Sequence, residues 1–419
     1  MKLQLGYGKG TQEVAVPDQN LLGVLESNPV TLGLTGEAEV RRALAEPIGA
    51  PPLRQVVHPG EKVAIITSDI TRPCPTAAIL PPVLDELWEA GISPEDVTLV
   101  FALGGHRPHT EEERRRLAGK QAWGQIRCVD SDPADCVHLG TTRAGTPVDV
   151  TRVVARADRR ICLGNIEYHY FAGYSGGGKA IMPGVSTRSA IQANHAMMVR
   201  QEARAGLLEG NPVREDIEEA AALCGVDYIV NVVLDEHKQV VRAVAGDSIQ
   251  AHRAGCAFLD TLYGKEIPRQ ADIVLVSQGG APKDLNLYQT QKALDNAKHA
   301  VRDGGVIILV GACQEGLGED TFQRWMEEAA APEDLVRRVR EHFELGGHKA
   351  AAIALVLERA SVYLVSEMPE DLVRRCFLTP FSSAQAALDQ AFRQLGADAT
   401  VLAMPYGGST LPLLRPERG

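Results

Sequence analysis

The stretch VAIITSDITRPCPTAAILPPVLDELWEAGISPEDVTLVF, residues 63–101, decides the fold class of this chain. Residues 63–67 are a short apolar run rich in β-branched side chains, which is typical of a buried parallel strand. Residues 76–90 then have helical character and stop at Gly91, and residues 97–101 form a second apolar run. A strand, a helix and a strand in this order predict a parallel sheet with helices against its faces.

The same alternation continues along the chain. Asn211 and Pro212 predict a helix start, because Asn can cap a helix and Pro fits its first turn, and that helix ends near Gly225. Residues 228–234 and 240–245 predict a hairpin. Residues 1–55, rich in Gly and Pro, predict irregular structure with small strands. The other expected strands are 161–163, 272–277, 305–311, 362–365 and 400–404, and the other expected helices are 288–302, 335–343, 349–359 and 384–395.

The length of 419 residues exceeds the usual size of one hydrophobic core. The alternating pattern restarts at Ala271, so we expect two α/β domains, residues 1–268 and 269–419, with a junction near Pro268. Each is expected to have a mostly parallel sheet flanked by helices. Ligands of such folds bind beyond the carboxyl ends of the strands, so we expect the active site there, in the cleft between the domains.

Composition excludes several classes of protein. The net charge of −11 argues against a nucleic-acid partner, because phosphate contacts need clustered Lys and Arg. No apolar stretch approaches the roughly 20 residues of a membrane helix, and the N-terminus has no apolar segment typical of a secretion signal. The eight cysteines form no C-x-x-C pair, which favours a reduced, cytoplasmic protein over a disulfide framework or a zinc ribbon.

Polar groups framed by Gly or Pro follow four of the expected strands. One segment is a glycine loop, in which residues 173–179, GYSGGGK, fit the first seven positions of G-x-x-x-x-G-K-[ST]. The eighth position is Ala180, which lacks the hydroxyl that holds magnesium in a P-loop ATPase. Three consecutive glycines would still let backbone amides approach a phosphate, although a plain Gly-rich turn explains them as well. The four segments are residues 68–73, 104–109, 167–179 and 278–284.

Four histidines, His106, His109, His169 and His195, lie in or near these segments. Two neutral imidazoles would suit a substrate that loses a proton on either of two faces. His195 lies in a helix-like stretch, where an imidazole could hold a metal. A zinc hydrolase is the competing use of the same histidines, but H-E-x-x-H is absent and the gap between His106 and His109 contains no Glu.

Two cations lie in different expected domains. Arg72 could bind a carboxylate through two parallel hydrogen bonds, and Lys292 would add a point charge. Tyr288 and Gln289 precede Lys292 on one predicted helix. Their spacings from Lys292, i to i+4 and i to i+3, would put either of them on the same helix face as Lys292. For each cation a solvated surface charge is the alternative.

These segments together resemble the nickel-pincer lactate racemase family. The resemblance spans residues 60–300 or so, and its strength lies in several ordered matches at similar spacing. The matching residues are Asp69-Ile70-Thr71-Arg72-Pro73, Gly104-Gly105-His106-Arg107, His169, Gly176-Gly177-Gly178-Lys179, Asn194-His195, Tyr288-Gln289 with Lys292, and Gly346-Gly347-His348-Lys349.

The resemblance implies a racemase or epimerase of 2-hydroxy acids. It implies a nickel-pincer nucleotide (nickel pyridinium-3,5-bisthiocarboxylic acid mononucleotide) joined to Lys179, with His195 as a nickel ligand. His106 and His169 would be the paired acid/base residues. The roles that follow for the other residues are substrate binding for Arg72, Tyr288, Gln289 and Lys292, and cofactor binding for Asp69, Gly177 and Gly178, with Asp69 and Thr71 alternatively orienting Arg72.

The implied reaction is an oxidation followed by its return. One histidine takes the hydroxyl proton while the α-hydrogen leaves as hydride, and a planar 2-keto acid receives hydride on its other face. Residues 1–268 would anchor the cofactor and residues 269–419 would close over the substrate, whether lactate, malate, an aromatic or a sugar acid. Cofactor-biosynthesis proteins are the implied partners. An inactive or phosphate-ligand-binding protein of the same fold is the alternative, beside the zinc hydrolase.

Overall fold

The structure of the chain, a computed structural model, describes residues 1–26, 28, 33–235 and 237–414. It divides into two compact units, which we call the central unit (residues 30–260) and the terminal unit (residues 1–29 with 261–419). In the part of the chain that is described, no helix is long and apolar enough to cross a membrane.

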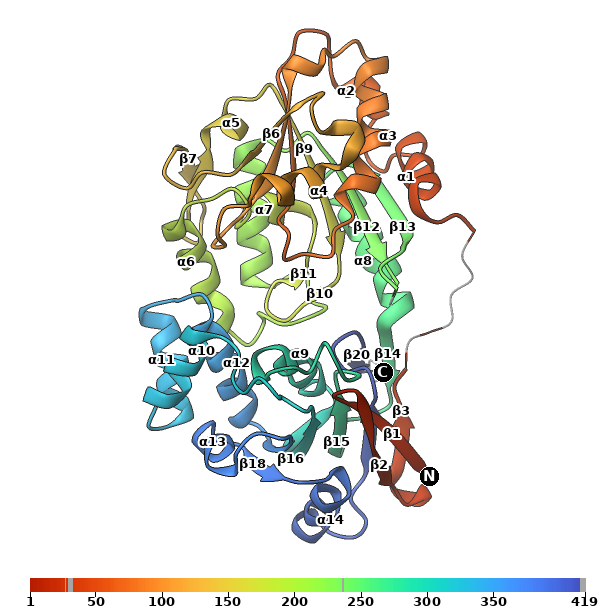
Figure 1. Cartoon of the computed structure of the whole chain (residues 1–419), viewed down its shortest axis with the longest axis vertical. Helices are drawn as coiled ribbons and strands as arrows, with labels where there is room; N and C mark the ends of the chain where they lie inside the picture. Colours follow the sequence, from red (N-terminus) through yellow and green to blue (C-terminus); the bar gives the residue numbers. More distant parts are fainter. Residues whose placement is uncertain (27, 29–32, 236, 415–419) are drawn as a thin grey trace. The chain divides into compact units, whose positions relative to one another are not determined.

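The central unit is built on a sheet with the strand order β13-β12-β9-β4-β5-β6. Figure 1 labels β13, β12, β9 and β6 of this sheet. All neighbouring strands run parallel except the edge pair β12–β13, which is the predicted hairpin. The strand predicted at residues 63–67 therefore lies at the middle of a parallel sheet. The strands are β4 (Val63–Ser68), β5 (Val97–Ala102), β6 (Arg127–Asp130), β9 (Arg159–Ile166), β12 (Tyr228–Leu234) and β13 (Val240–Gly246).

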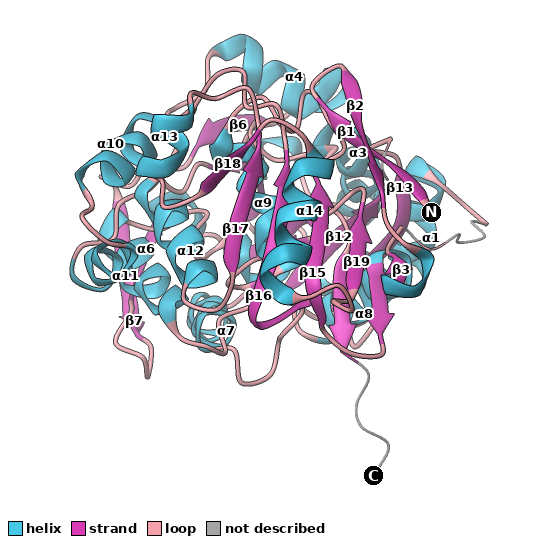
Figure 2. Cartoon of the chain, turned by 90° about the horizontal axis from the view of Figure 1, so that it is seen from below, coloured by secondary structure: helices cyan, strands magenta, loops and turns pink. Residues whose placement is uncertain are grey.

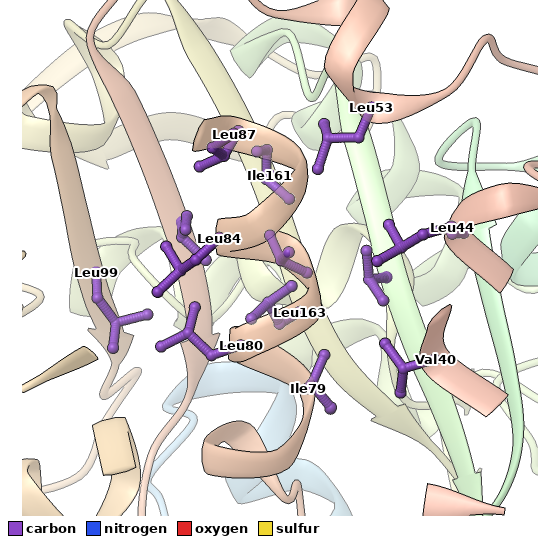
Figure 3. Packing of buried hydrophobic residues seen from close by; sticks show 14 of the residues in the cluster. Val40, Leu44, Leu53, Ile79, Leu80, Leu84, Leu87, Leu99, Ile161 and Leu163 are labelled. Carbon is purple, nitrogen blue, oxygen red and sulfur yellow. The ribbon is translucent and has the colours of Figure 1, made fainter. Parts of the chain in front are cut away.

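The helix predicted at residues 76–90 is α3 (Thr76–Glu89), and it packs on one face of this sheet (Figure 3). Successive strand residues point to opposite faces, so Leu99 and Ile161 meet Leu80 and Leu84 of this helix in one buried cluster. Burying each such side chain stabilises the fold by about 1.5–3 kcal/mol. The same cluster includes residues of α1 (Gly36–Ala45), α2 (Leu53–Val56) and α4 (Glu111–Ala122).

The opposite face of the sheet carries the functional segments. A short 3-10 helix, η3 (Gly177–Ala180), contacts β4, β9 and α7 (Pro212–Cys224). The helix predicted from Asn211-Pro212 is thus confirmed, and the Asn211 side chain accepts hydrogen bonds from the backbone N–H groups of Val213 and Arg214. Helix α8 (Gln250–Tyr263) packs on the same face, where Gly255 lies against Ile166 of β9.

The terminal unit contains a second, fully parallel sheet, with the order β18-β17-β16-β15-β19-β3 (Figure 2). Helix α14 (Ala384–Leu395) covers one face, and α9 (Leu287–Ala297) and α12 (Gly347–Leu357) contact its strands as well. The strands are β3 (Leu21–Val24), β15 (Ala271–Ser277), β16 (Val301–Val310), β17 (Ser361–Val365), β18 (Thr379–Phe381) and β19 (Val401–Met404).

The expected domains 1–268 and 269–419 need a correction, because the first residues of the chain fold with the last. Strands β1 (Lys2–Tyr7) and β2 (Gly10–Ala15) form a hairpin whose Leu3, Leu5 and Val14 lie in the core of the terminal unit. The buried carboxylate of Asp284 accepts hydrogen bonds from the backbone N–H groups of Gly8 and Ala312, at 2.8 and 3.0 Å. Strand β14 (Gly264–Ile267) likewise pairs with β20 (Leu411–Leu414) inside this unit.

Several helices lie where the sequence predicted none, α1 and α10 among them. Helix α1 falls in the Gly- and Pro-rich segment predicted to be irregular, and its Val40, Ala43 and Leu44 are buried at helical spacing. Helix α10 (Asp320–Glu328) buries Phe322 and Trp325 in the same way. The helix expected at 288–302 ends at Ala297, and the strand expected at 305–311 begins at Val301.

Candidate active site

Three neighbouring strands of the central unit deliver polar segments at one edge of the sheet. Strands β9, β4 and β5 are adjacent and parallel, so the residues that follow them emerge side by side. Asp69 to Arg72 follow β4, His106 follows β5, and His169 follows β9. The site predicted at the carboxyl ends of the strands is therefore assembled from segments far apart in the sequence.

His106 is paired with Asp69 across two of these loops. The Nδ1 atom of His106 lies 2.7 Å from Oδ2 of Asp69, a carboxylate that is 4% exposed. The Thr71 hydroxyl donates to the same carboxylate at 2.8 Å. Burial raises the pKa of Asp69, but hydrogen bonding and charge from His106, with Thr71 and Arg72, lower it more, so the net pKa lies below the usual value. An ionised Asp69 holds the proton of His106 on Nδ1 and leaves the lone pair on Nε2.

Asp69 and Thr71 both contact His106. The expectation that they orient Arg72 or contact the cofactor stays a prediction. His109, three residues further on, has a structural role. Its Nε2 accepts from the backbone N–H of Ile70 at 3.1 Å, and its Nδ1 lies 2.7 Å from Asp130. His109 thus fixes the loop that carries Asp69, and both of its ring nitrogens have protein partners.

The hairpin that carries His169 is held from several sides. Strands β10 (Tyr168–His169) and β11 (Gly173–Tyr174) pair antiparallel. The hydroxyl groups of Tyr168 and Tyr174 both donate to Asp260, at 2.7 and 2.8 Å. The buried guanidinium of Arg214 donates to the carbonyls of Ala172 and Tyr174. The hairpin that carries His169 is therefore held by side chains from two helices, α7 and α8.

One aromatic ring at the tip of this hairpin, Phe171, is surrounded by three predicted site residues. The ring of His169 lies 4.5 Å and that of His195 4.9 Å from the Phe171 ring, centroid to centroid, both edge to face. The Nζ atom of Lys179 lies 5.8 Å from the same centroid. Phe171 is 2% exposed and was not predicted as a site residue, because nothing in its local sequence distinguishes it from an ordinary core aromatic.

Positive charge accumulates around Lys179 and His169. Burial lowers the pKa of Lys179 well below its usual value, and the charges of Arg72 and Arg214 lower it further, against an opposing effect of Glu167. Burial also lowers the pKa of His169 well below its usual value, followed by the charges of Lys179, Arg72, His195 and Arg214. The Nη1 atom of Arg214 is buried without a hydrogen-bond partner among the described residues. Such a cluster is suited to an anionic ligand.

His169 and His106 present different nitrogens to their protein partners. The Nδ1 atom of His169 accepts from the backbone N–H of Ala172 at 3.3 Å. A neutral His169 therefore carries its proton on Nε2, whereas His106 carries its proton on Nδ1. The site accordingly contains one imidazole set to accept a proton and another set to donate a hydrogen bond.

The glycine loop has a packing role that the sequence did not reveal. A Cβ on Gly176 would lie 2.7 Å from Oδ1 of Asn231, and one on Gly178 would lie 2.8 Å from Cβ of Ala221. The backbone N–H of Gly177 donates to Asn231 at 2.7 Å. The amide of Gly177 therefore has a partner within the protein, and the approach of the glycine loop to a phosphate stays a prediction.

The competing hypotheses find less support in this geometry. A P-loop precedes a full α-helix, but residues 177–180 form only one turn of 3-10 helix. No group of three or more His, Cys, Asp or Glu side chains suited to a metal occurs among the residues that the structure describes. The described residues thus provide neither the P-loop of an ATPase nor the ligand set of a zinc hydrolase.

The remaining predicted residues belong to the terminal unit. Tyr288, Gln289 and Lys292 lie on the first turns of α9, which supports the prediction that they share a helix face. Lys349 is buried beside Tyr288, with Nζ 3.7 Å from the ring centroid and 2.8 Å from the Tyr288 carbonyl oxygen, to which it donates. Lys349, in the motif at residues 346–349, thus holds Tyr288, the first of the three residues on this helix face.

Comparison with known proteins decides the family. Models of the lactate racemase N-terminal domain and the lactate racemase C-terminal domain match residues 7–206 and 267–411. The chain is 32% identical to a lactate racemase from Thermoanaerobacterium thermosaccharolyticum, over 98% of each protein. This chain belongs to the lactate racemase family. It is also 30% identical to a lactate racemase from Lactiplantibacillus plantarum, over 97% of this chain and 98% of that protein.

Solved structures agree with this membership of the lactate racemase family. The lactate racemase apoprotein from Thermoanaerobacterium thermosaccharolyticum matches with a TM-score of 0.90, covering 99% of this chain and all of that one. A protein from Thermotoga maritima matches with a TM-score of 0.62 at 20% identity, which shows a shared fold alone. As a member of the lactate racemase family, the chain is an isomerase of the racemase type.

Proposed function

We propose that this chain racemises or epimerises a 2-hydroxy acid with a nickel-pincer nucleotide joined covalently to Lys179. The observation that carries the proposal is the arrangement of Lys179, His169 and His195 around the ring of Phe171. An amine, a proton-transfer group and a metal ligand are the three groups that such a cofactor requires, and they surround one buried ring.

The residues fit this cofactor in charge and in chemistry. A lowered pKa gives Lys179 a larger share of neutral amine, which is the nucleophilic form needed to form a thioamide. The cations Arg72 and Arg214 suit an anionic nucleotide. His195 would supply an imidazole nitrogen to nickel, which accepts such ligands readily. When bound, the group would serve as acceptor and donor of the substrate α-hydrogen as hydride.

His106 and His169 are the proposed acid and base. The Nε2 atom of His106 carries a lone pair and would accept the hydroxyl proton of one enantiomer, while the Asp69 carboxylate stabilises the imidazolium that forms. Loss of that proton and of the α-hydrogen leaves a planar 2-keto acid. For the other enantiomer, His169 would exchange the proton through Nε2, which requires its resting proton to move to Nδ1 and the contact of Nδ1 with the Ala172 N–H to be given up. A substrate carboxylate near Arg72 would offset the positive charge that lowers the pKa of His169.

Arg72 is the proposed carboxylate ligand in the central unit, because a guanidinium binds a carboxylate through two hydrogen bonds. Tyr288, Gln289 and Lys292 are proposed as further substrate-binding residues. Cofactor-biosynthesis proteins are proposed partners, because a preassembled group must reach Lys179. A cytoplasmic location is proposed as well, since all eight cysteines are free thiols, as is usual in a reducing compartment.

The proposal is tested by a racemisation assay on protein produced together with the cofactor-making proteins. Single enantiomers of lactate, malate, an aromatic and a sugar 2-hydroxy acid are followed by loss of optical rotation. We expect turnover of one class, lost in His106→Ala and in His169→Ala while the mass of the Lys179 adduct is unchanged. Normal racemisation by both variants would contradict the acid/base assignment.

A further inference from the structure

Asp216, on helix α7, is a buried carboxylate that collects hydrogen bonds from two other elements. It is 2% exposed. The hydroxyls of Thr142 and Thr146, from the turn between β7 (Cys136–Thr141) and β8 (Pro147–Thr151), both donate to it. The third donor is the Nδ2 atom of Asn194, on helix α6 (Arg188–Ala196), at 2.7 Å. A buried carboxylate with three donors is well satisfied and holds each of them in one orientation.

This carboxylate decides which way the Asn194 amide points. Asn194 is fully buried, and its Nδ2 faces two acceptors, Asp216 and the carbonyl of Val213 at 3.3 Å. Turning the amide over would bring its oxygen against a carboxylate and a carbonyl, so the orientation is fixed. The oxygen Oδ1 therefore faces the neighbouring imidazole, at 2.9 Å from Nδ1 of His195.

We propose that Asn194 and Asp216 set the tautomer of His195 and so present its Nε2 atom as the metal-binding nitrogen. The Asn194 oxygen can only accept, so Nδ1 of His195 must carry the proton. A neutral imidazole with its proton on Nδ1 has its lone pair on Nε2, which is the form that binds a metal. Asn194 and Asp216 are thus positioning residues. The identity of the metal rests on the proposed function, whereas the tautomer does not.

The tautomer is measured in the apoprotein by long-range 1H–15N NMR with 15N-histidine, and His195 is assigned by comparison with His195→Gln. We expect the pattern of an imidazole protonated on Nδ1. Protonation on Nε2 in the wild-type chain would overturn the proposal. This measurement needs no substitution at Asn194 or Asp216 and no cofactor, so it stands even where those two substitutions disturb folding.

Two variants test whether Asn194 and Asp216 set the tautomer of His195. Asn194→Leu removes the acceptor, and Asp216→Ala removes the group that orients it; each is expected to mix the tautomers and to lower nickel retention about 10- to 100-fold in protein loaded with cofactor. The matched control is Thr146→Val, which removes another donor from the same carboxylate and should change neither readout. An unchanged His195 tautomer with unchanged nickel retention in Asn194→Leu would refute the proposal that Asn194 sets the tautomer. Wild-type protein without nickel would instead contradict the proposed function, while the NMR result would still decide the tautomer.

Discussion

The carboxylate of Asp69 and the Nδ1 atom of His106 lie 2.7 Å apart, on loops that follow two neighbouring strands of one sheet. The pairing gives His106 a defined tautomer. Asp69→Asn keeps the shape but can turn a donor toward the ring, so kcat is expected to fall about 10²- to 10⁴-fold. Steady-state racemisation and intact mass measure this, and the cofactor adduct should persist. Thr71→Val, which leaves the Asp69–His106 contact in place, should have a smaller effect, and equal losses in both variants would argue against the pairing.

Lys179 is expected to react as a nucleophile at neutral pH. Burial and the charges of Arg72 and Arg214 lower its pKa, so more of the amine is neutral than for an ordinary lysine. Acetic anhydride at limiting concentration, followed by peptide mapping across a pH series, should show half-maximal labelling of Lys179 at a lower pH than that of Lys120, which is exposed. Half-maximal labelling of Lys179 at a higher pH than that of Lys120 would contradict the inference that burial and the charges of Arg72 and Arg214 lower its pKa.

Removing Arg72 is expected to raise the pKa of His169. After burial and Lys179, the charge of Arg72 is among the causes that lower it, so Arg72→Gln should move the titration toward the usual value. The imidazole signals of the apoprotein, followed by NMR against pH, measure the change. Arg107→Gln is the control, because Arg107 is paired with Glu113 on the exposed side of its loop. A fall in the pKa of His169 in Arg72→Gln would contradict the inference that the charge of Arg72 lowers it.

The buried His252 is expected to make the central unit less stable in acid. Burial, with the charge of Arg214, lowers its pKa to about 3, so the folded state does not take up a proton that the unfolded state binds near pH 6.5. The contribution of the neutral His252 to the free energy of unfolding is fully present above pH 6.5. It is lost as the pH falls toward 3, at about 1.4 kcal/mol per pH unit. Urea unfolding of the wild type and His252→Gln at pH 7 and pH 5 tests this, with His58→Gln as the exposed control. An unchanged slope in His252→Gln would refute it.

The glycine loop is expected to tolerate no side chain at Gly176. Its φ of 76° costs an alanine about 1–2 kcal/mol, and the clash with Asn231 and Ile166 adds about 1–3 kcal/mol. Gly60→Ala is a matched control, because Gly60 has a similar φ of 86° with open space around it. Thermal unfolding should separate the two variants, and equal melting temperatures would show that packing does not restrict the loop.

Much of the fold was predictable because buried parallel strands are continuous apolar runs. Residues 63–67, 97–101 and 272–277 carry that signal and form strands. The membership of residues 1–29 in the terminal unit was not predictable, since it depends on long-range contacts such as Asp284 with Gly8. The hydrophobic spacing of α1 was present but was masked by flanking Gly and Pro.

Within the candidate site, the residues with chemical side chains could be proposed from the sequence, whereas their supports could not. His106, His169, Lys179 and His195 stand in motifs, and the last three gather around one ring. Phe171, Arg214 and Asp216 lie outside those motifs or look like core residues, and only their contacts reveal what they do. A Gly-rich motif followed by Lys was likewise ambiguous, because packing and ligand binding both select glycine.

The central claim is that Lys179 anchors a nickel-containing cofactor for racemisation. The most direct measurement is intact-mass spectrometry with peptide mapping and nickel analysis on the full chain, produced with the cofactor-making proteins and compared with Lys179→Ala. The account predicts an added mass on the peptide that contains Lys179, with nickel bound, and neither in the variant. A wild-type chain with the mass of the bare polypeptide and no nickel under those conditions would contradict it.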